Sequence, residues 1–185
     1  MDKDEAMLRL IRGNEEYQGS RSAIGDISPA VRLKTARCGQ TPFAVIITCS
    51  DSRVIPEAIF NCGIGDLFVI RVAGNVIDNH QLGSIEYAAD HLGTNLVVVL
   101  GHTCCGAVDA AINHDPEGYI KFITDEIQAA IGAERDPYKA GCLNVKRSIA
   151  LIESSVSIRK DEAKGLSVVG AMYDIETGKV EFLKD

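Results

Sequence analysis

Three side chains that bind soft metal ions follow two apolar segments of the sequence. Cys49 follows the apolar run 43–47, and His102 and Cys105 follow the run 96–100. Short continuous runs of this kind are typical of strands that are buried on both faces of a parallel sheet. Because ligands bind at the carboxyl ends of such strands, we expect the three side chains to meet there.

Two cysteines and one histidine form a ligand set that predicts a zinc site. Zinc binds thiolate sulfur and imidazole nitrogen, and its catalytic sites keep three protein ligands and an open fourth position. Cys105 also stands where a helix is expected to begin, and a helix N-terminus favours a thiolate. Gly106 next to it allows close approach of the backbone. We therefore expect one zinc ion at Cys49, His102 and Cys105.

Asp51 and Arg53 give this site two alternative states. The carboxylate of Asp51, two residues after a ligand, could bind the metal itself and close the site. It could instead accept a forked pair of hydrogen bonds from the guanidinium of Arg53, which leaves the fourth metal position open. The sequence alone leaves both states open.

Composition and charge exclude several classes of function. The chain has 185 residues, 46% hydrophobic and 24% charged, which are the values of a folded domain rather than a disordered chain. A net charge of −7 disfavours nucleic acids and anionic membrane surfaces as partners. Apolar runs are too short for a membrane span, and we expect no signal peptide. We therefore expect a cytoplasmic protein whose six cysteines are not paired in disulfides.

The predicted secondary structure alternates between strands and helices. Strands are expected at 43–47, 67–70, 96–100, 166–174 and 179–183, and helices at 4–17, after Ser28-Pro29, and at 81–92, 105–112, 117–131 and 142–160. This alternation predicts an α/β fold, with a mostly parallel sheet flanked by helices and an antiparallel C-terminal edge strand. We expect a single domain over residues 1–185, with an N-terminal helical arm at 1–42 and an α/β core at 43–185.

The metal-binding motifs resemble those of the β-class carbonic anhydrases. Cys49-Ser-Asp-Ser-Arg53 and His102-x-x-Cys105 carry the resemblance, which extends over segments 10–17, 65–75, 83–88, 98–102 and 170–174. It implies a zinc lyase that reversibly hydrates CO₂ to bicarbonate and a proton, in which hydroxide on the zinc attacks the carbon. It also implies that Asp51 and Arg53 form a gating dyad.

The same resemblance implies a substrate pocket and an oligomer. Gln40 falls where plant-like members have a substrate-binding glutamine, and Phe68 and Tyr87 fall where they have pocket aromatics. Ala73 stands in place of a valine, and Gly106 would offer its backbone N–H to the substrate. Family members form dimers, often paired into tetramers, with pocket residues crossing the interface, so we expect a homodimer or homotetramer.

The sequence also bears on regulation, and it leaves two alternative functions open. Ile46 stands where members regulated by bicarbonate have a tryptophan, so we expect that regulation to be absent or altered.

One alternative to CO₂ hydration is a hydrolase of carbonyl sulfide or carbon disulfide, which resemble CO₂ in shape. The other is a non-catalytic zinc-binding protein in which Asp51 closes the site permanently.

Overall fold

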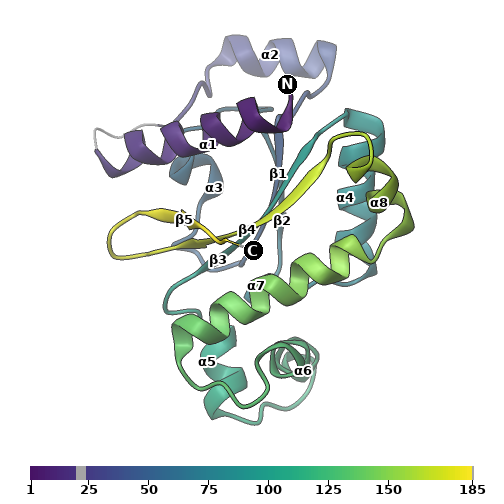
Figure 1. Cartoon of the computed structure of the whole chain (residues 1–185). Coiled ribbons are helices and arrows are strands. Elements are labelled where there is room, and N and C mark those ends of the chain that lie inside the picture. The colour runs from purple at the N-terminus through teal and green to yellow at the C-terminus, as the bar shows by residue number, and fades with distance from the viewer. Residues whose placement is uncertain (20–23, 185) are drawn as a thin grey trace.

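A five-stranded sheet forms the centre of the computed structural model, which describes residues 1–19 and 24–184 (Figure 1). Its strands are β1 (Ala44–Thr48), β2 (Leu67–Arg71), β3 (Leu96–His102), β4 (Ser167–Tyr173) and β5 (Val180–Phe182), in the order β2-β1-β3-β4-β5. Strands β1 to β4 run parallel to one another, and β5 pairs antiparallel with β4. The predicted mostly parallel sheet with an antiparallel C-terminal edge strand is confirmed.

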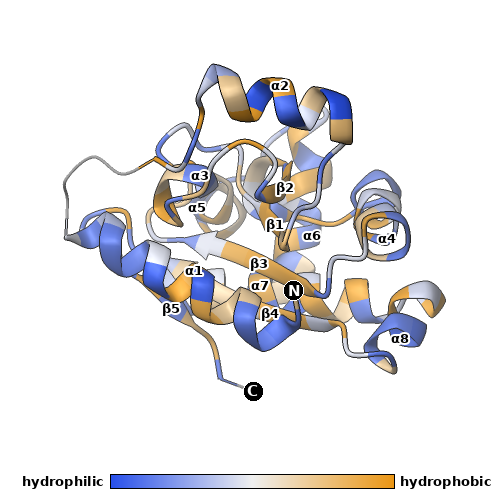
Figure 2. Cartoon of the chain, turned by 90° about the horizontal axis from the view of Figure 1, so that it is seen from above, coloured by the Kyte–Doolittle hydropathy of each residue, from blue (hydrophilic) through white to orange (hydrophobic). Residues whose placement is uncertain are grey.

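Helices cover both faces of this sheet and its carboxyl end (Figures 1 and 2). They are α1 (Lys3–Gln18), α2 (Pro29–Cys38), α3 (Pro56–Ile59), α4 (Asn79–Leu92), α5 (Gly106–Asn113), α6 (Ile120–Ile131), α7 (Pro137–Glu153) and α8 (Val156–Glu162). Residues of α1 and α3 pack on one face, and residues of α4, α7 and α8 pack on the other. In the part of the chain described, no helix is both long and apolar enough to cross a membrane.

Neighbouring residues of β1 enter different cores, because side chains alternate across a strand. Ile46 packs with Leu10 and Phe60 on the α1 face, whereas Ile47 packs with Ile85 on the α4 face. All residues of β1 and β3 are consequently buried. A third apolar cluster joins α5 and α6 around Cys49 and leads directly to the candidate site.

The predicted helix at 142–160 was wrong as a single element. It is the end of α7 followed by α8, and the break falls at Ser154 and Ser155. The hydroxyl of Ser155 accepts hydrogen bonds from the backbone N–H groups of Ser157 and Ile158 and so caps the new helix. The four-residue helix α3 was not predicted, although Pro56 at its first turn is a start signal.

The N-terminal helices differ in how they meet the core. Leu10 of α1 is fully buried, and the side-chain amide of Asn14 donates to the Gly178 carbonyl at 2.8 Å. Ser28 caps α2 with Pro29 in its first turn, as predicted, but α2 has no buried residue. The part of the predicted arm at residues 20–23 lies outside the described residues.

Candidate metal centre

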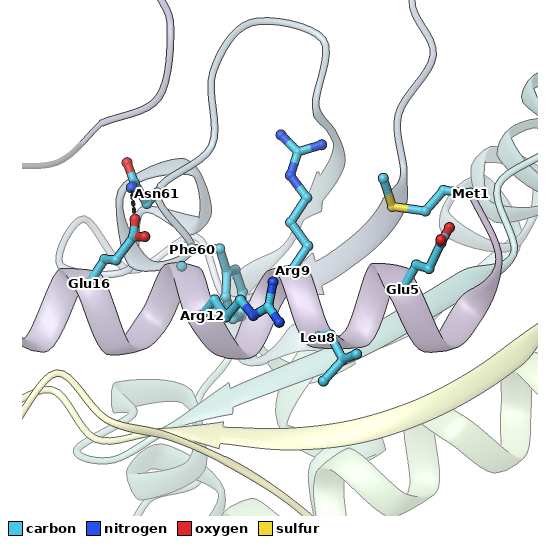
Figure 3. Close-up of a pocket in the computed structure, with 9 residues that line it drawn as sticks. Met1, Glu5, Leu8, Arg9, Arg12, Glu16, Phe60 and Asn61 are labelled. Carbon is cyan, nitrogen blue, oxygen red and sulfur yellow. Dashed lines mark hydrogen bonds between the residues drawn. The ribbon is translucent and has the colours of Figure 1, made fainter.

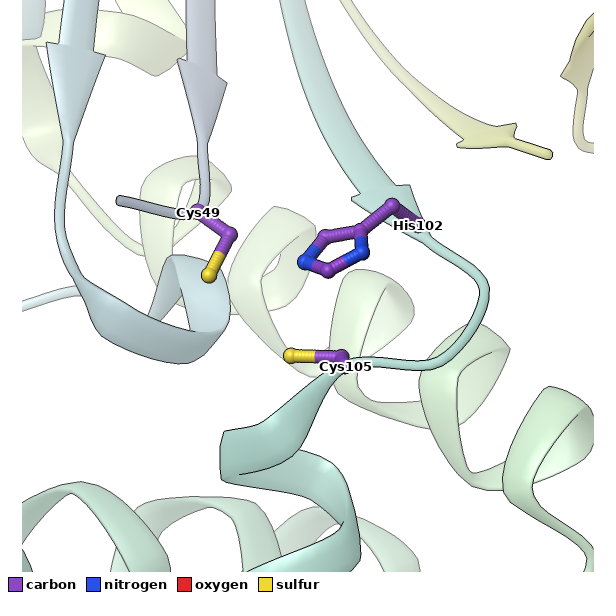
Figure 4. A group of neighbouring side chains, drawn as sticks. All are labelled: Cys49, His102 and Cys105. Carbon is purple, nitrogen blue, oxygen red and sulfur yellow. The ribbon is translucent and has the colours of Figure 1, made fainter. Parts of the chain in front are cut away.

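The candidate site lies where the order of the strands reverses. From β1 the chain passes outward to β2 and then returns to β3 on the other side of β1. In open α/β sheets this switch point opens a crevice beyond the carboxyl ends of the two central strands. Cys49 directly follows β1, His102 ends β3, and Cys105 directly precedes α5. The topology therefore brings together the three residues selected from the sequence (Figure 4).

The three side chains form a compact and buried group. One ligand atom of each lies within 4.8 Å of the others, and the exposed fractions of Cys49, His102 and Cys105 are 5%, 3% and 7%. Nδ1 of His102 lies 2.9 Å from the carbonyl of Thr103, whereas its buried Nε2 has no partner among the described residues. A buried nitrogen without a partner, beside two thiols, fits a metal ion bound through Nε2. This group could hold zinc.

Hydrogen bonds around the two sulfurs favour a thiolate at Cys49. The Cys105 thiol hydrogen-bonds the Cys49 sulfur, which lowers the pKa of Cys49 and raises that of Cys105. The backbone N–H of Gly74 also donates to Cys49 Sγ at 3.2 Å, and this too lowers the pKa. The N–H groups of Ala107 and Val108, in the first turn of α5, lower the pKa of Cys105 and so partly oppose the effect of Cys49. A cation between the sulfurs would favour thiolates at both.

Asp51 is paired with Arg53. The guanidinium donates from Nε to Oδ1 at 2.9 Å and from Nη2 to Oδ2 at 2.7 Å. Nη2 also donates to the carbonyl of Cys104 at 3.0 Å, which ties the dyad to the loop between His102 and Cys105. The Arg53 guanidinium holds the pKa of Asp51 well below its usual range. Of the two states left open by the sequence, the structure contains the one in which Asp51 does not belong to the ligand group.

Arg71 is a contributor to the site that the sequence analysis missed. It ends β2 and is the register partner of Thr48, the last residue of β1. Its Nε donates to the Cys49 carbonyl at 3.1 Å and its Nη2 to the Asp51 carbonyl at 2.7 Å. A charged residue at the end of an otherwise apolar strand was the available signal.

The five predicted pocket residues separate by position into two that lie beside the metal ligands or their contacts and three that lie elsewhere in the fold. Ala73 precedes Gly74, the donor to Cys49, and Gly106 follows Cys105, with open space where a Cβ would lie. Phe68 instead pairs in register with Val45, four residues or about 13 Å along the strand before Cys49. Tyr87 lies on α4 with its ring centroid 6.2 Å from that of Phe68. Gln40 precedes β1, at the end of the strand opposite Cys49.

A separate solvent-open hollow lies along α1, away from this group (Figure 3). Its lining includes Glu5, Arg9, Arg12 and Glu16 from the helix, together with Asn61 beyond α3. Asn61 donates a hydrogen bond to Glu16, and Arg9 forms an ion pair with Asp66 at 2.8 Å. None of the described residues that line the hollow is a cysteine or histidine, so its lining differs from the ligand set of the candidate centre.

Comparisons with known proteins agree with this site. A family model described as carbonic anhydrase matches residues 44–180. Carbonic anhydrase 2 of Mycobacterium tuberculosis is 38% identical over 186 residues, covering 94% of this chain and 89% of the relative. The carbonic anhydrase of Mycolicibacterium smegmatis is 40% identical over 156 residues, covering 77% and 75%.

Solved structures show the same similarity. A tetrameric β-carbonic anhydrase of Sordaria macrospora superimposes with a TM-score of 0.79 at 29% identity, covering 85% of this chain and 88% of that one. The β-carbonic anhydrase of Coccomyxa, in complex with acetazolamide, gives a TM-score of 0.73 at 28% identity, covering 84% and 78%. The chain belongs to the β-carbonic anhydrase family. By enzyme class, the chain is accordingly a carbonic anhydrase.

Proposed function

We propose that this chain catalyses the reversible hydration of CO₂ to bicarbonate and a proton at a zinc ion held by Cys49, His102 and Cys105. The observation that carries the proposal is the combination of three buried, convergent ligands with a carboxylate held aside by Arg53. Such a site keeps three protein ligands and a free fourth position, which is the arrangement of catalytic rather than structural zinc.

Zinc bound at these ligands would supply a Lewis acid that lowers the pKa of water and so provides a nucleophile. The residues of the chain supply position. Arg53 holds Asp51 in a forked contact, and Arg71 fixes the carbonyls on either side of Ser50. Gly106 is the first residue of α5, so its N–H has no partner within the helix and is available to a substrate oxygen.

Asp51 and Arg53 are proposed to act as a gate. In the open state the guanidinium satisfies both carboxylate oxygens, which leaves the carboxylate little tendency to bind a cation. Loss of that contact would free Asp51 to become the fourth ligand, because it lies only two residues from Cys49. A permanently closed, non-catalytic site is therefore disfavoured by the pairing of Asp51.

Stopped-flow CO₂ hydration on protein with a verified zinc content tests this function. The assay runs from neutral to alkaline pH, with a buffer that accepts the released proton. Activity that rises with pH is expected, because deprotonated water is the nucleophile. Absence of activity at every pH, with zinc bound, would refute the proposal.

Sulfur analogues of CO₂ are separated from it by their product. The same zinc-verified protein, supplied with carbonyl sulfide or carbon disulfide, would release sulfide if it were a hydrolase of those substrates. Sulfide release without CO₂ hydration would assign the site to that alternative chemistry. We expect the opposite result.

A homodimer or homotetramer is proposed to complete the pocket. Within one chain Gln40 and Phe68 lie away from Cys49, so they could line the pocket only of a second subunit. The outer edge of β2 has no strand partner among the described residues, and α2 has no buried residue. Light scattering at micromolar concentration is expected to show an oligomer, and a monomer would contradict this proposal.

Ile46 supports the proposal that regulation by bicarbonate is absent or altered. Its side chain is fully buried in the apolar core on the α1 face, so this position offers no polar group to an anion. CO₂ hydration measured against bicarbonate concentration is expected to show no cooperative inhibition. Strong cooperative inhibition would contradict the expectation.

A further inference from the structure

Two buried polar side chains of α7 are directed at the short turn beside Cys49. Asn144 Nδ2 donates to the Gly74 carbonyl at 2.7 Å, and Ser148 Oγ donates to the Asn75 carbonyl at 3.0 Å. The two residues are four apart and so share one face of the helix. Their exposed fractions are only 2% and 1%. The turn in which Gly74 lies also supplies the N–H that donates to Cys49 Sγ at 3.2 Å.

The backbone of this turn needs outside support. Gly74 and Asn75 both have positive φ values, +67° and +46°, and the left-handed conformation is unfavourable for a residue with a side chain. In this conformation both carbonyls turn towards α7, where a buried carbonyl without a partner would be costly. Asn144 and Ser148 therefore stabilise the conformation that points the Gly74 N–H at the sulfur.

We propose that Asn144 and Ser148 are positioning residues for the metal ligand Cys49. By fixing the turn, they keep the Gly74 N–H hydrogen-bonded to the sulfur of Cys49. This hydrogen bond withdraws negative charge from the thiolate. The strength of the metal–sulfur bond then depends partly on α7, whose residues lie about 70 positions after the turn in the sequence. The inference rests on the proposed function only in requiring that Cys49 binds a metal.

The surroundings of the two side chains argue against a role in packing alone. Val145 and Ile152 of the same helix belong to the apolar core on the α4 face. Apolar residues at positions 144 and 148 would extend that core, but they would leave the carbonyls of Gly74 and Asn75 without these donors. Instead both positions carry polar groups, and both groups reach the same two-residue turn. Groups beside a metal ligand that fix its orientation are expected to affect metal affinity strongly.

The test compares Asn144→Ala and Ser148→Ala with the control Thr94→Val. Thr94 is 2% exposed and its hydroxyl donates to the Pro42 carbonyl at 3.1 Å, so its loss also removes one buried hydrogen bond to the backbone. Zinc affinity is measured by competition with a chromophoric chelator. The absorption of the cobalt(II)-substituted protein then reports the thiolate-to-metal charge transfer.

We expect Asn144→Ala to lower zinc affinity by about 10- to 100-fold, and Ser148→Ala to lower it less. In both variants the charge-transfer band should move to longer wavelength, because a thiolate without its N–H donor is a better electron donor. Thr94→Val should lose stability without either change. A purely structural role would affect all three variants alike in stability and leave the band in place.

Wild-type affinity and an unshifted band in folded Asn144→Ala would overturn the inference. If that variant does not fold, the same result in Ser148→Ala would overturn it. The outcome is independent of CO₂ hydration. A wild-type chain that binds zinc and hydrates no CO₂ would refute the proposed function and leave the inference standing, whereas a wild-type chain that binds no zinc would overturn both.

Discussion

Gly74→Ala is the substitution for which the structure gives the most specific expectation. An added Cβ would lie 2.8 Å from Cδ1 of Ile127 and 3.0 Å from the Cβ of Ala107. The end of Ile127 can rotate away, but the Cβ of Ala107 is fixed to the start of α5 and can move only with the helix. Since Cys105 directly precedes that helix, relief of the contact would displace a metal ligand.

The magnitude follows from two separate costs. Placing alanine at a φ of +67° costs about 1–2 kcal/mol, and overpacking adds about 1–3 kcal/mol. We therefore expect the free energy of unfolding to fall by about 2–5 kcal/mol. For a chain of this size that corresponds to a fall in Tm of roughly 4–20 °C.

Gly93→Ala is the matched control. Gly93 has almost the same φ, +68°, but beyond its chain neighbours no atom of the described residues lies within 4 Å of the position that an added Cβ would take, so only the backbone cost applies. A fall in Tm of roughly 2–8 °C is expected, with no effect on zinc affinity. The assay is thermal unfolding followed by circular dichroism, together with zinc affinity by chelator competition.

Equal losses of stability in the two variants, with unchanged zinc affinity in Gly74→Ala, would refute the reasoning. That result would mean that the turn accommodates a methyl group without moving α5. A larger loss in Gly74→Ala, accompanied by weaker zinc binding, is the expected outcome. The difference between the variants measures the steric contact alone, because the backbone cost is common to both.

Three further predictions concern the residues around the metal. Arg53→Ala should abolish CO₂ hydration while zinc is retained, because Asp51 loses its forked partner and can close the site; full turnover in stopped-flow assays would show that the dyad is no gate. Arg71→Ala should weaken zinc binding by about tenfold, since two carbonyls of the Cys49 loop lose their donor; chelator competition would measure this, and unchanged affinity would argue against a positioning role. Removal of zinc should lower Tm reversibly by roughly 5–10 °C, as expected for loss of a ligand present at about 100 times its Kd; a Tm that zinc does not restore would contradict a native metal site.

The ligand set could be predicted because Cys49 and His102 lie at the ends of apolar strands. Continuous apolar runs identify buried strands, and the parallel arrangement brings their carboxyl ends together, so Cys49 and His102 had to be neighbours once β1 and β3 paired. Cys105 then follows within one turn of His102. These steps need only local patterns and one rule of topology.

The supporting residues could not be predicted, because their contacts join distant segments. Asn144 bonds a carbonyl 70 residues away, and Arg71 bonds carbonyls 22 and 20 residues away. Each residue alone has an ordinary alternative, a polar position on a helix or a charge at the end of a strand. The pairing of Asp51 with Arg53 was only one of two states that the sequence allowed, and the structure distinguishes them by geometry.

Backbone conformation explains why the site is less predictable than the sheet that carries it. Apart from glycine, the described residues with positive φ are Asn61, Asn75 and Cys104. Cys104 directly precedes the ligand Cys105, and Asn75 follows Gly74, whose N–H donates to Cys49. Cysteine has no preference for the left-handed region, so no pattern could indicate its conformation at position 104. Yet the carbonyl of Cys104 accepts a hydrogen bond from Arg53, and the Gly74–Asn75 turn donates one to Cys49. Unfavourable backbone conformations thus place the groups that surround the ligands, and the buried sheet and α7 provide the packing that maintains them.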